Sequence, residues 1–317
     1  MHALHARVGK NFDLAQKIQR NHHYIEEHPE SLRGKWATWA APCQADEKRE
    51  RLQLSSFREV RLDLGCGKGS FTLAQALREP DVLFLGMDAE PLCIALAAEK
   101  AAAYGISNLL FFPGSAENIE KIFAEGELAR VYINFPTPFP RTKEAKKRLV
   151  YLDNLLHLRN CMQEDALLIF KSDSFPLVQF ARTQFERAGW ELLASSDDLH
   201  KERRLHARAD VEIHAHERAH DLAHDLMCKL TREPTSEYEE KLTAKGAKVF
   251  VRVYTRGQVP DPAKRTQVES LSLQDYLPKD LSQMDYVPSG MEGTVLNLIN
   301  YAKKHNNQRL QRQLADE

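Results

Sequence analysis

The stretch VRLDLGCGKGS, residues Val60–Ser70, decides the fold of this chain. A short apolar run stops at a cluster of glycines, and an amphipathic segment, Phe71 to Leu77, follows at once. This order predicts a buried strand, a tight turn and the start of a helix. Glycine allows a backbone to turn sharply or to pass close to a ligand. The three glycines of the turn are Gly65, Gly67 and Gly69.

Two phosphate-binding patterns do not fit this turn. A phosphate loop would close with Gly-Lys-Ser or Gly-Lys-Thr. The dinucleotide fingerprint needs a third glycine where Ser70 stands. The pattern G-x-G-x-G with an acid two residues upstream, Asp63, instead resembles the first motif of class I methyltransferases, which use S-adenosylmethionine (SAM). A purely structural glycine turn remains the alternative at this point.

Composition limits the protein classes that need to be considered. A chain of 317 residues can bury one sizeable core, with room for an appended domain or tail. Because 44 basic residues nearly balance 45 acidic ones, any nucleic-acid binding must come from local patches. The five dispersed cysteines fit a reducing compartment better than a disulfide framework. With no cleavable leader and no apolar run of spanning length, we expect a soluble cytoplasmic protein without a membrane partner.

Apolar strands alternate with helices from residue 60 onward. This alternation predicts an α/β fold with a mainly parallel sheet covered by helices on both faces. The expected strands are Val60–Leu64, Val82–Met87, Leu109–Phe112, Arg130–Phe135, Leu167–Lys171, Trp190–Ala194 and Val249–Tyr254. The first expected helix follows the glycine turn and ends near Arg78. The others are Pro91–Tyr104, Arg148–Met162 and Phe175–Ala188.

The flanks and one internal segment differ from this core in composition. Residues 1–59 predict an N-terminal extension, in which LRGKW, Leu32–Trp36, is either an RNA-contacting tract or a loop with a buried tryptophan. Residues 60–256 form the predicted main domain, with a charged, histidine-rich insertion at about 201–232. Residues 257–317 predict an extended linker and an amphipathic helix, Thr294–Leu314. The run His216–His220, HERAH, matches a zinc signature, but its polar surroundings favour a solvated helix and no metal site.

Ligands of such sheets bind outside the carboxyl ends of the strands. This rule selects Asp88 after the second strand, Ser115 after the third, Asn134–Pro140 after the fourth and Asp173 after the fifth. Asp88 is placed to accept two hydrogen bonds from a ribose diol, each worth about 1.5–3 kcal/mol because the acceptor is charged. A helix N-cap is the alternative role for this residue.

The segment INFPTPFPRTKEAKKRL, Ile133–Leu149, is the candidate loop for binding the molecule on which the protein acts. We call it the acceptor loop. Three prolines within five residues forbid a helix, and Phe135 and Phe139 offer flat surfaces to a flipped base. The basic residues that follow suggest phosphate contacts, with an exposed basic helix start as the alternative. They are Arg141, Lys143, Lys146, Lys147 and Arg148.

Four motifs now make the resemblance specific. The chain resembles the bacterial tRNA (guanine-N7)-methyltransferase family, which carries an N-F-x-D-P-W-P-K loop followed by a basic K-R-R-L tract. The matching segments here are NFPTPFPR with KKRL, FKSDS at Phe170–Ser174, DDLH at Asp197–His200 and SEYEEKLTAKG at Ser236–Gly246. The match runs from about Arg33 to Tyr254. It implies the Rossmann-like fold of SAM-dependent methyltransferases, SAM as cofactor and a guanine in the tRNA variable loop as substrate.

The resemblance also assigns roles to residues. Thr137 and Asp173 would be catalytic. The SAM pocket would be lined by Asp63, Gly65, Gly67, Gly69, Asp88, Ser115 and Asn134. The guanine and tRNA side would hold Arg141, Asp173, Ser236, Glu237 and Glu239. Guanine N7 carries no proton, so catalysis would consist of aligning its lone pair with the methyl group while nearby acids offset the charge formed on the ring.

Two positions depart from the family pattern. The acid of the acceptor loop is Thr137 here, and the acid after the third strand is Ser115. Threonine accepts a hydrogen bond but supplies no charge, so we expect methyl transfer to be slower by about ten- to a hundredfold. Our hypothesis is that Asp173 or Glu237 takes over part of this role. The alternatives are a degenerate, non-catalytic SAM- or tRNA-binding homologue and a methyltransferase that acts on another substrate.

Overall fold

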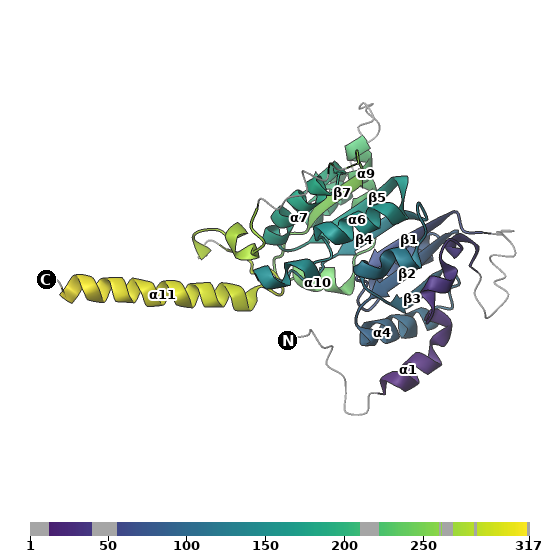
Figure 1. The fold of residues 1–317 in the computed structure, drawn as a ribbon, viewed down its shortest axis with the longest axis horizontal. Helices are drawn as coiled ribbons and strands as arrows, with labels where there is room; N and C mark the ends of the chain where they lie inside the picture. Colours follow the sequence, from purple (N-terminus) through teal and green to yellow (C-terminus); the bar gives the residue numbers. More distant parts are fainter. Residues whose placement is uncertain are drawn as a thin grey trace.

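A single seven-stranded sheet organises the molecule (Figure 1). The computed structural model describes residues 13–39, 56–209, 222–259, 261, 269–281 and 284–315. The strand order is β3-β2-β1-β4-β5-β7-β6. The strands are β1 (Glu59–Leu64), β2 (Val82–Asp88), β3 (Leu109–Pro113), β4 (Leu128–Asn134), β5 (Met162–Ser172), β6 (Trp190–Ser196) and β7 (Phe250–Arg256).

Strand direction brings the candidate site together. β1 pairs in parallel with β2 and β4, β2 with β3, and β4 with β5. β7 is antiparallel to both of its neighbours, β5 and β6. The carboxyl ends of β1 to β5 therefore lie at one edge, as the mainly parallel sheet of the sequence prediction requires. The order reverses at β1, and such a switch point is where ligands bind in open α/β sheets.

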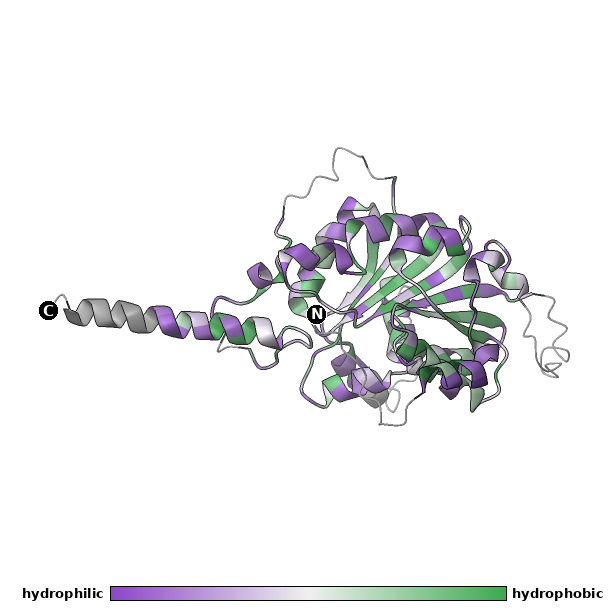
Figure 2. Cartoon of the chain, turned by 60° about the horizontal axis from the view of Figure 1, so that its bottom comes forward, coloured by the Kyte–Doolittle hydropathy of each residue, from purple (hydrophilic) through white to green (hydrophobic). Residues whose placement is uncertain are grey.

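Helices cover both faces of the sheet, and a separate apolar cluster fills the space on each side. One cluster holds side chains of α5, α6 and α7; the other holds those of α3, α4 and α9. Figure 2 shows apolar strands inside and polar helix surfaces outside. The main-domain helices are α3 (Ser70–Arg78), α4 (Pro91–Ala102), η4 (Ala116–Asn118), α5 (Ile119–Ile122), η5 (Thr142–Lys147), α6 (Leu152–Cys161), α7 (Phe175–Arg187), α8 (Leu199–Ala209), α9 (Leu222–Thr231) and α10 (Glu237–Thr243).

The expected elements are present, and several boundaries differ: β5, for example, begins at Met162 and not at Leu167, and the differences at the end of β4 and the start of α6 have a clear physical reason. β4 ends at Asn134 because Phe135 has a φ of 50°, which extended backbone does not adopt. The predicted helix Arg148–Met162 begins only at Leu152, because the backbone at Arg148 is extended. In the predicted insertion, α8 and α9 are described, while His216–His220 lie outside the described residues.

The N-terminal region packs on the sheet. Its described elements are α1 (Leu14–Arg20), η1 (His22–Tyr24), η2 (Pro29–Leu32) and η3 (Trp36–Thr38). Trp36 is fully buried, stacks on Phe112 and donates its indole N–H to the carbonyl of Ile122 at 3.0 Å. The loop with a buried tryptophan that was predicted for Leu32–Trp36 is therefore confirmed.

The C-terminal region differs from the predicted linker. After η7 (Leu273–Tyr276), the chain returns to the sheet before α11 (Glu292–Ala315) runs away from the body (Figure 1). Leu273 and Met291 are fully buried in the main core, and Val295 is nearly so. These apolar side chains dock the segment on the main domain. No described helix is both long and apolar enough to cross a membrane.

Candidate active site

The glycine turn connects β1 to α3 and is hydrogen-bonded to the carboxyl end of β2. Gly65, Gly67 and Gly69 all have positive φ, at 80°, 53° and 68°. The backbone N–H groups of Gly65 and Cys66 donate to the carbonyl of Met87 at 2.8 and 3.1 Å. A Cβ on Gly69 would lie 2.6 Å from the Cβ of Ala97, so side chains are excluded where α3 approaches α4. The turn therefore requires glycine both for its conformation and for helix packing.

Asp63 and Asn134 form the polar floor of the site. Asp63 is buried; it accepts from Thr72 Oγ1 at 2.6 Å and from Asn134 Nδ2 at 3.3 Å. Burial raises the pKa of Asp63 to about 6, although both hydrogen bonds oppose that shift. Asn134 Oδ1 is buried and has no hydrogen-bond partner among the residues that the structure describes. A buried carboxylate beside an unused acceptor suits an ammonium group, such as that of an amino-acid moiety.

Asp88 lies at the end of β2 and faces the turn. Its Oδ2 accepts from the N–H of Gly67 and its Oδ1 from the N–H of Glu90, both at 2.9 Å. Burial raises the pKa of Asp88, and these backbone donors oppose the shift. The N-cap of α4 is Glu90, so the alternative role of Asp88 as the helix cap does not hold. A carboxylate has about four acceptor positions, which leaves capacity for a diol.

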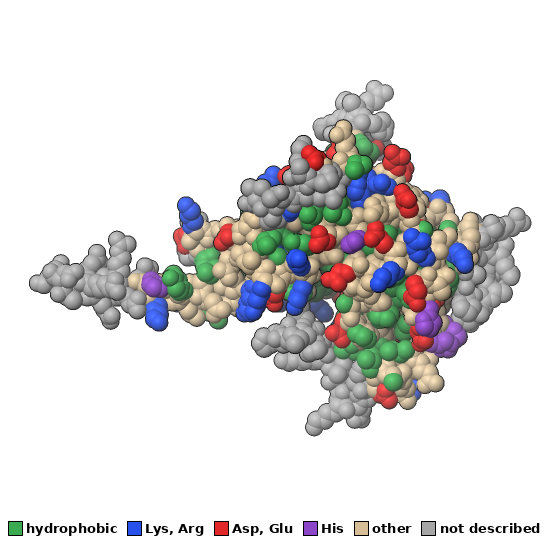
Figure 3. All heavy atoms as spheres, in the orientation of Figure 1, with side chains coloured by type: hydrophobic (Ala, Val, Ile, Leu, Met, Phe, Trp, Pro, Cys, Tyr) green, Lys and Arg blue, Asp and Glu red, His purple; other side chains and the backbone are tan. Residues whose placement is uncertain are grey.

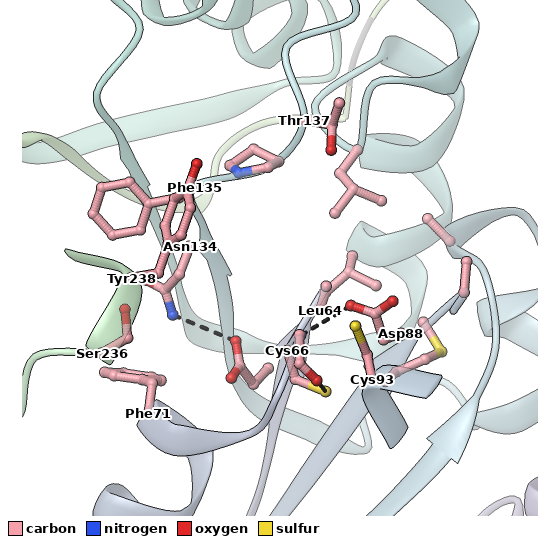
Figure 4. A pocket seen from close by; sticks show the side chains of 18 of the residues that line it. Leu64, Cys66, Phe71, Asp88, Cys93, Asn134, Phe135, Thr137, Ser236 and Tyr238 are labelled. Atoms are coloured by element: carbon pink, nitrogen blue, oxygen red, sulfur yellow. Dashed lines mark hydrogen bonds between the residues drawn. The ribbon is translucent and has the colours of Figure 1, made fainter. Parts of the chain in front are cut away.

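These groups line one cavity of about 690 Å³. This volume falls within the range of small-molecule sites. In Figure 4, Asp88 and Cys93 face Asn134, Phe135 and Tyr238 across the cavity, with Thr137 at its rim. The cavity thus has a cofactor end at the glycine turn and an acceptor end at the loop after β4. Of the predicted site residues, it brings together Asp63, Gly65, Gly67, Asp88, Ser115, Asn134, Thr137, Asp173, Ser236 and Glu237.

Three predicted site residues lie elsewhere. Gly69 caps α3 behind the cavity wall. Arg141 is exposed and lies in the acceptor loop outside the cavity lining. Glu239 is buried in an ion pair with Arg203, so its position does not support substrate contact. Glu237 lines the cavity and also pairs with Lys100.

The acceptor loop is held in a strained conformation. Phe135 and Phe139 have φ values of 50° and 44°, which non-glycine residues rarely adopt. The Arg148 guanidinium donates to the carbonyls of Pro138 and Phe139, at 3.0 and 2.7 Å, and to that of Leu271 at 2.9 Å. It is fully buried and lies 4.3 Å from the ring of Phe180. The prediction that Arg148 contacts phosphates is therefore wrong, and its role is to support the loop.

Several residues that line the cavity were not predicted from the sequence. Glu117 lies two positions after Ser115 and lines the cavity. It supplies an acid near the end of β3, where Ser115 replaces the acid of the family pattern. Tyr238 packs edge-on against Phe135, with ring centroids 5.7 Å apart. Glu117 lies two positions from Ser115, and Tyr238 lies within the motif SEYEEKLTAKG, so the sequence could have indicated both. Ser289 and Gly290 come from the C-terminal region, where the sequence carried no such signal.

The sheet order, the glycine turn after β1 and the acid after β2 define the Rossmann-like fold of SAM-dependent methyltransferases. The sequence model of a family described as "Putative methyltransferase" matches residues 58–252. The chain belongs to the tRNA (guanine-N7)-methyltransferase family.

Curated relatives support this assignment. A tRNA (guanine-N(7)-)-methyltransferase of Mesoplasma florum is 30% identical over 195 residues, covering 58% of this chain and 84% of the relative. Enzymes of the same name from Streptococcus pyogenes and Geobacillus kaustophilus are 28% and 26% identical, covering 61% and 74% of this chain and 85% and 89% of the relatives.

The chain is also similar to the solved structure of the 16S rRNA methyltransferase KamB, with a TM-score of 0.44 at 16% identity, covering 70% of this chain and 98% of that one; the family assignment does not rest on this similarity.

Proposed function

We propose that this chain transfers the methyl group of SAM to N7 of a guanine in tRNA. The observation that carries the proposal is the cavity that joins the cofactor turn to the acceptor loop of the family. Because tRNA is the substrate, we infer that the protein works in the cytoplasm.

The residues present fit SAM at the cofactor end. Asp63 and the unused Asn134 Oδ1 would hold the ammonium group, and Asp88 would accept from the ribose hydroxyls. Ser115 and Glu117 would border the adenine. When bound, SAM supplies an electrophilic methyl group on a sulfonium centre.

The acceptor end would bind and orient the guanine. N7 is an acceptor without a proton, so the site needs no general base there. Phe135 and Tyr238 would flank the base, and Asp173 would accept from its N–H donors and offset the positive charge formed on the ring. Thr137 would accept one hydrogen bond at the position where the family pattern has an acid. Alignment of the N7 lone pair is the main contribution of the protein to the rate.

Local charge supports RNA binding where the global charge does not. Figure 3 shows acidic and basic side chains interspersed over the body, as expected for a net charge of -1. Lys146 and Lys147 line the cavity rim, and Lys303 and Lys304 are exposed on α11. Residues 293–315 contain four basic residues and no acid. Phosphates of a tRNA held at the cavity would meet these two basic groups.

The test is incubation of the protein with methyl-labelled SAM and bulk tRNA, followed by digestion and nucleoside analysis. Label in 7-methylguanosine is the expected result. SAM binding without transfer would instead identify a non-catalytic homologue, and label in another nucleoside would identify a different substrate.

A further inference from the structure

The segment before α11 contacts the carboxylate of Asp173. Tyr286 Oη donates to Asp173 Oδ2 at 2.7 Å, and the backbone N–H of Ser289 donates to the same oxygen at 2.9 Å. Asp173 itself is 7% exposed and lines the cavity. Both hydrogen bonds use one oxygen, which leaves Oδ1 as the acceptor for a base.

This segment is anchored on both sides of the contact. Met291 is fully buried, and its Sδ accepts a hydrogen bond from Ser174 Oγ at 3.4 Å. Ser174 directly follows Asp173 in the chain. Upstream, the N–H of Leu273 donates to the carbonyl of Pro140 at 3.0 Å, at the end of the acceptor loop. Ser289 lines the cavity together with Tyr238 of α10. The C-terminal segment thus links the acceptor loop to the end of β5.

We propose that Tyr286 is a positioning residue, which together with the Ser289 N–H fixes the Asp173 carboxylate for the target guanine. A carboxylate rotates about its terminal torsion unless its oxygens are held, and donors to a charged oxygen are among the stronger hydrogen bonds. The segment lies outside the matched family region, residues 58–252. The inference rests on the proposed function, since it assigns the guanine to Asp173.

The test compares full-length Tyr286→Phe with wild type and with Tyr276→Phe. Tyr276 is a matched control, because its hydroxyl donates to the carbonyl of Ser270 at 3.1 Å in the same C-terminal region. We expect Tyr286→Phe to lower kcat/KM for tRNA about tenfold, and Tyr276→Phe to leave it unchanged. The Kd for SAM should stay within about twofold for both variants, since Asp173 is on the acceptor side.

A double-mutant cycle separates positioning from general stability. In an Asp173→Asn background, loss of the Tyr286 hydroxyl should change kcat/KM by less than about twofold. An equal loss in both backgrounds, or no loss in either, would overturn the proposal. The proposal would also be overturned if Tyr286→Phe lowered the Tm more than Tyr276→Phe does and also weakened SAM binding. That result would show that Tyr286 has a purely structural role. Failure of the proposed function itself is distinct, because wild type would then place no methyl group on guanine N7.

Discussion

The side-chain amide of Asn134 donates to the carboxylate of Asp63, and its own side-chain oxygen has no partner within the described part of the chain. Asp63 belongs to β1 and precedes the cofactor turn, whereas Asn134 ends β4 and begins the acceptor loop. One hydrogen bond therefore couples the two halves of the site, and a ligand that donates to both residues would order them together.

Cofactor affinity should depend on pH through Asp63. Its pKa is about 6 in the folded protein and 3.8 in a solvated chain, so the ionised form costs about 3 kcal/mol of stability at neutral pH. That cost falls as the pH drops through 6, so the free protein gains stability there.

An ammonium ligand needs the ionised form, so SAM affinity should fall about tenfold per pH unit below 6. Calorimetric titration from pH 5 to 8 measures this, and Asp63→Asn should remove the dependence; a flat wild-type profile contradicts it.

Asp88→Ala should weaken SAM binding by at least about a hundredfold, because two hydrogen bonds to a charged acceptor are lost. Asp81→Ala is the matched control: Asp81 lies just before the other end of β2 and bonds to Arg58 on the surface. Calorimetric Kd values for the two variants decide the point. Unchanged affinity in Asp88→Ala would show that the ribose is held elsewhere.

Arg148→Met should lower the free energy of unfolding by about 2–4 kcal/mol, since it leaves loop carbonyls without their donor. Arg141→Met, on the exposed side of the same loop, should change it by less than about 0.5 kcal/mol. Urea unfolding measures both. Equal stability of the two variants would mean that the buried guanidinium does not support the loop.

Thr137→Asp should raise the rate of methyl transfer about ten- to a hundredfold, because it restores the charge that the family pattern N-F-x-D-P-W-P-K has at this position. Thr142→Asp is the control, since Thr142 lies in η5 and outside the cavity lining. Single-turnover rates with bound SAM give the comparison. A slower Thr137→Asp enzyme would show that Asp173 or Glu237 already supplies the charge.

Lys303→Gln combined with Lys304→Gln should weaken tRNA binding. It should also reduce the slope of log Kd against log salt concentration by about one to two, because each phosphate that a lysine no longer neutralises keeps its counterions. Arg78→Gln is the control, because Arg78 ends α3 at the edge of the sheet away from the cavity. Filter binding over a range of salt concentrations measures the slopes. Parallel slopes for wild type and the double variant would remove α11 from the RNA-binding surface.

Local patterns predicted the parts of the site that follow strand ends. Asp63, Asp88 and Asn134 lie at one edge because parallel strands end there, and alternation alone identified those strands. Glu239 was misplaced because it lies two residues from Glu237 on α10, and positions two apart do not share a helix face. The basic run gave no sign that Arg148 is buried, since its partner Leu271 lies 123 positions away. Contacts of that range, including Tyr286 with Asp173, are set by tertiary packing.

Methyl transfer in this cavity requires the N7 atom of the target guanine. The most direct measurement is transfer of label from SAM to matched tRNA transcripts that contain guanosine or 7-deazaguanosine, which has carbon in place of N7. We predict label on the guanosine transcript, recovered as 7-methylguanosine, and none on the 7-deaza transcript. Equal labelling of both transcripts, or none on either with SAM bound, would contradict the account.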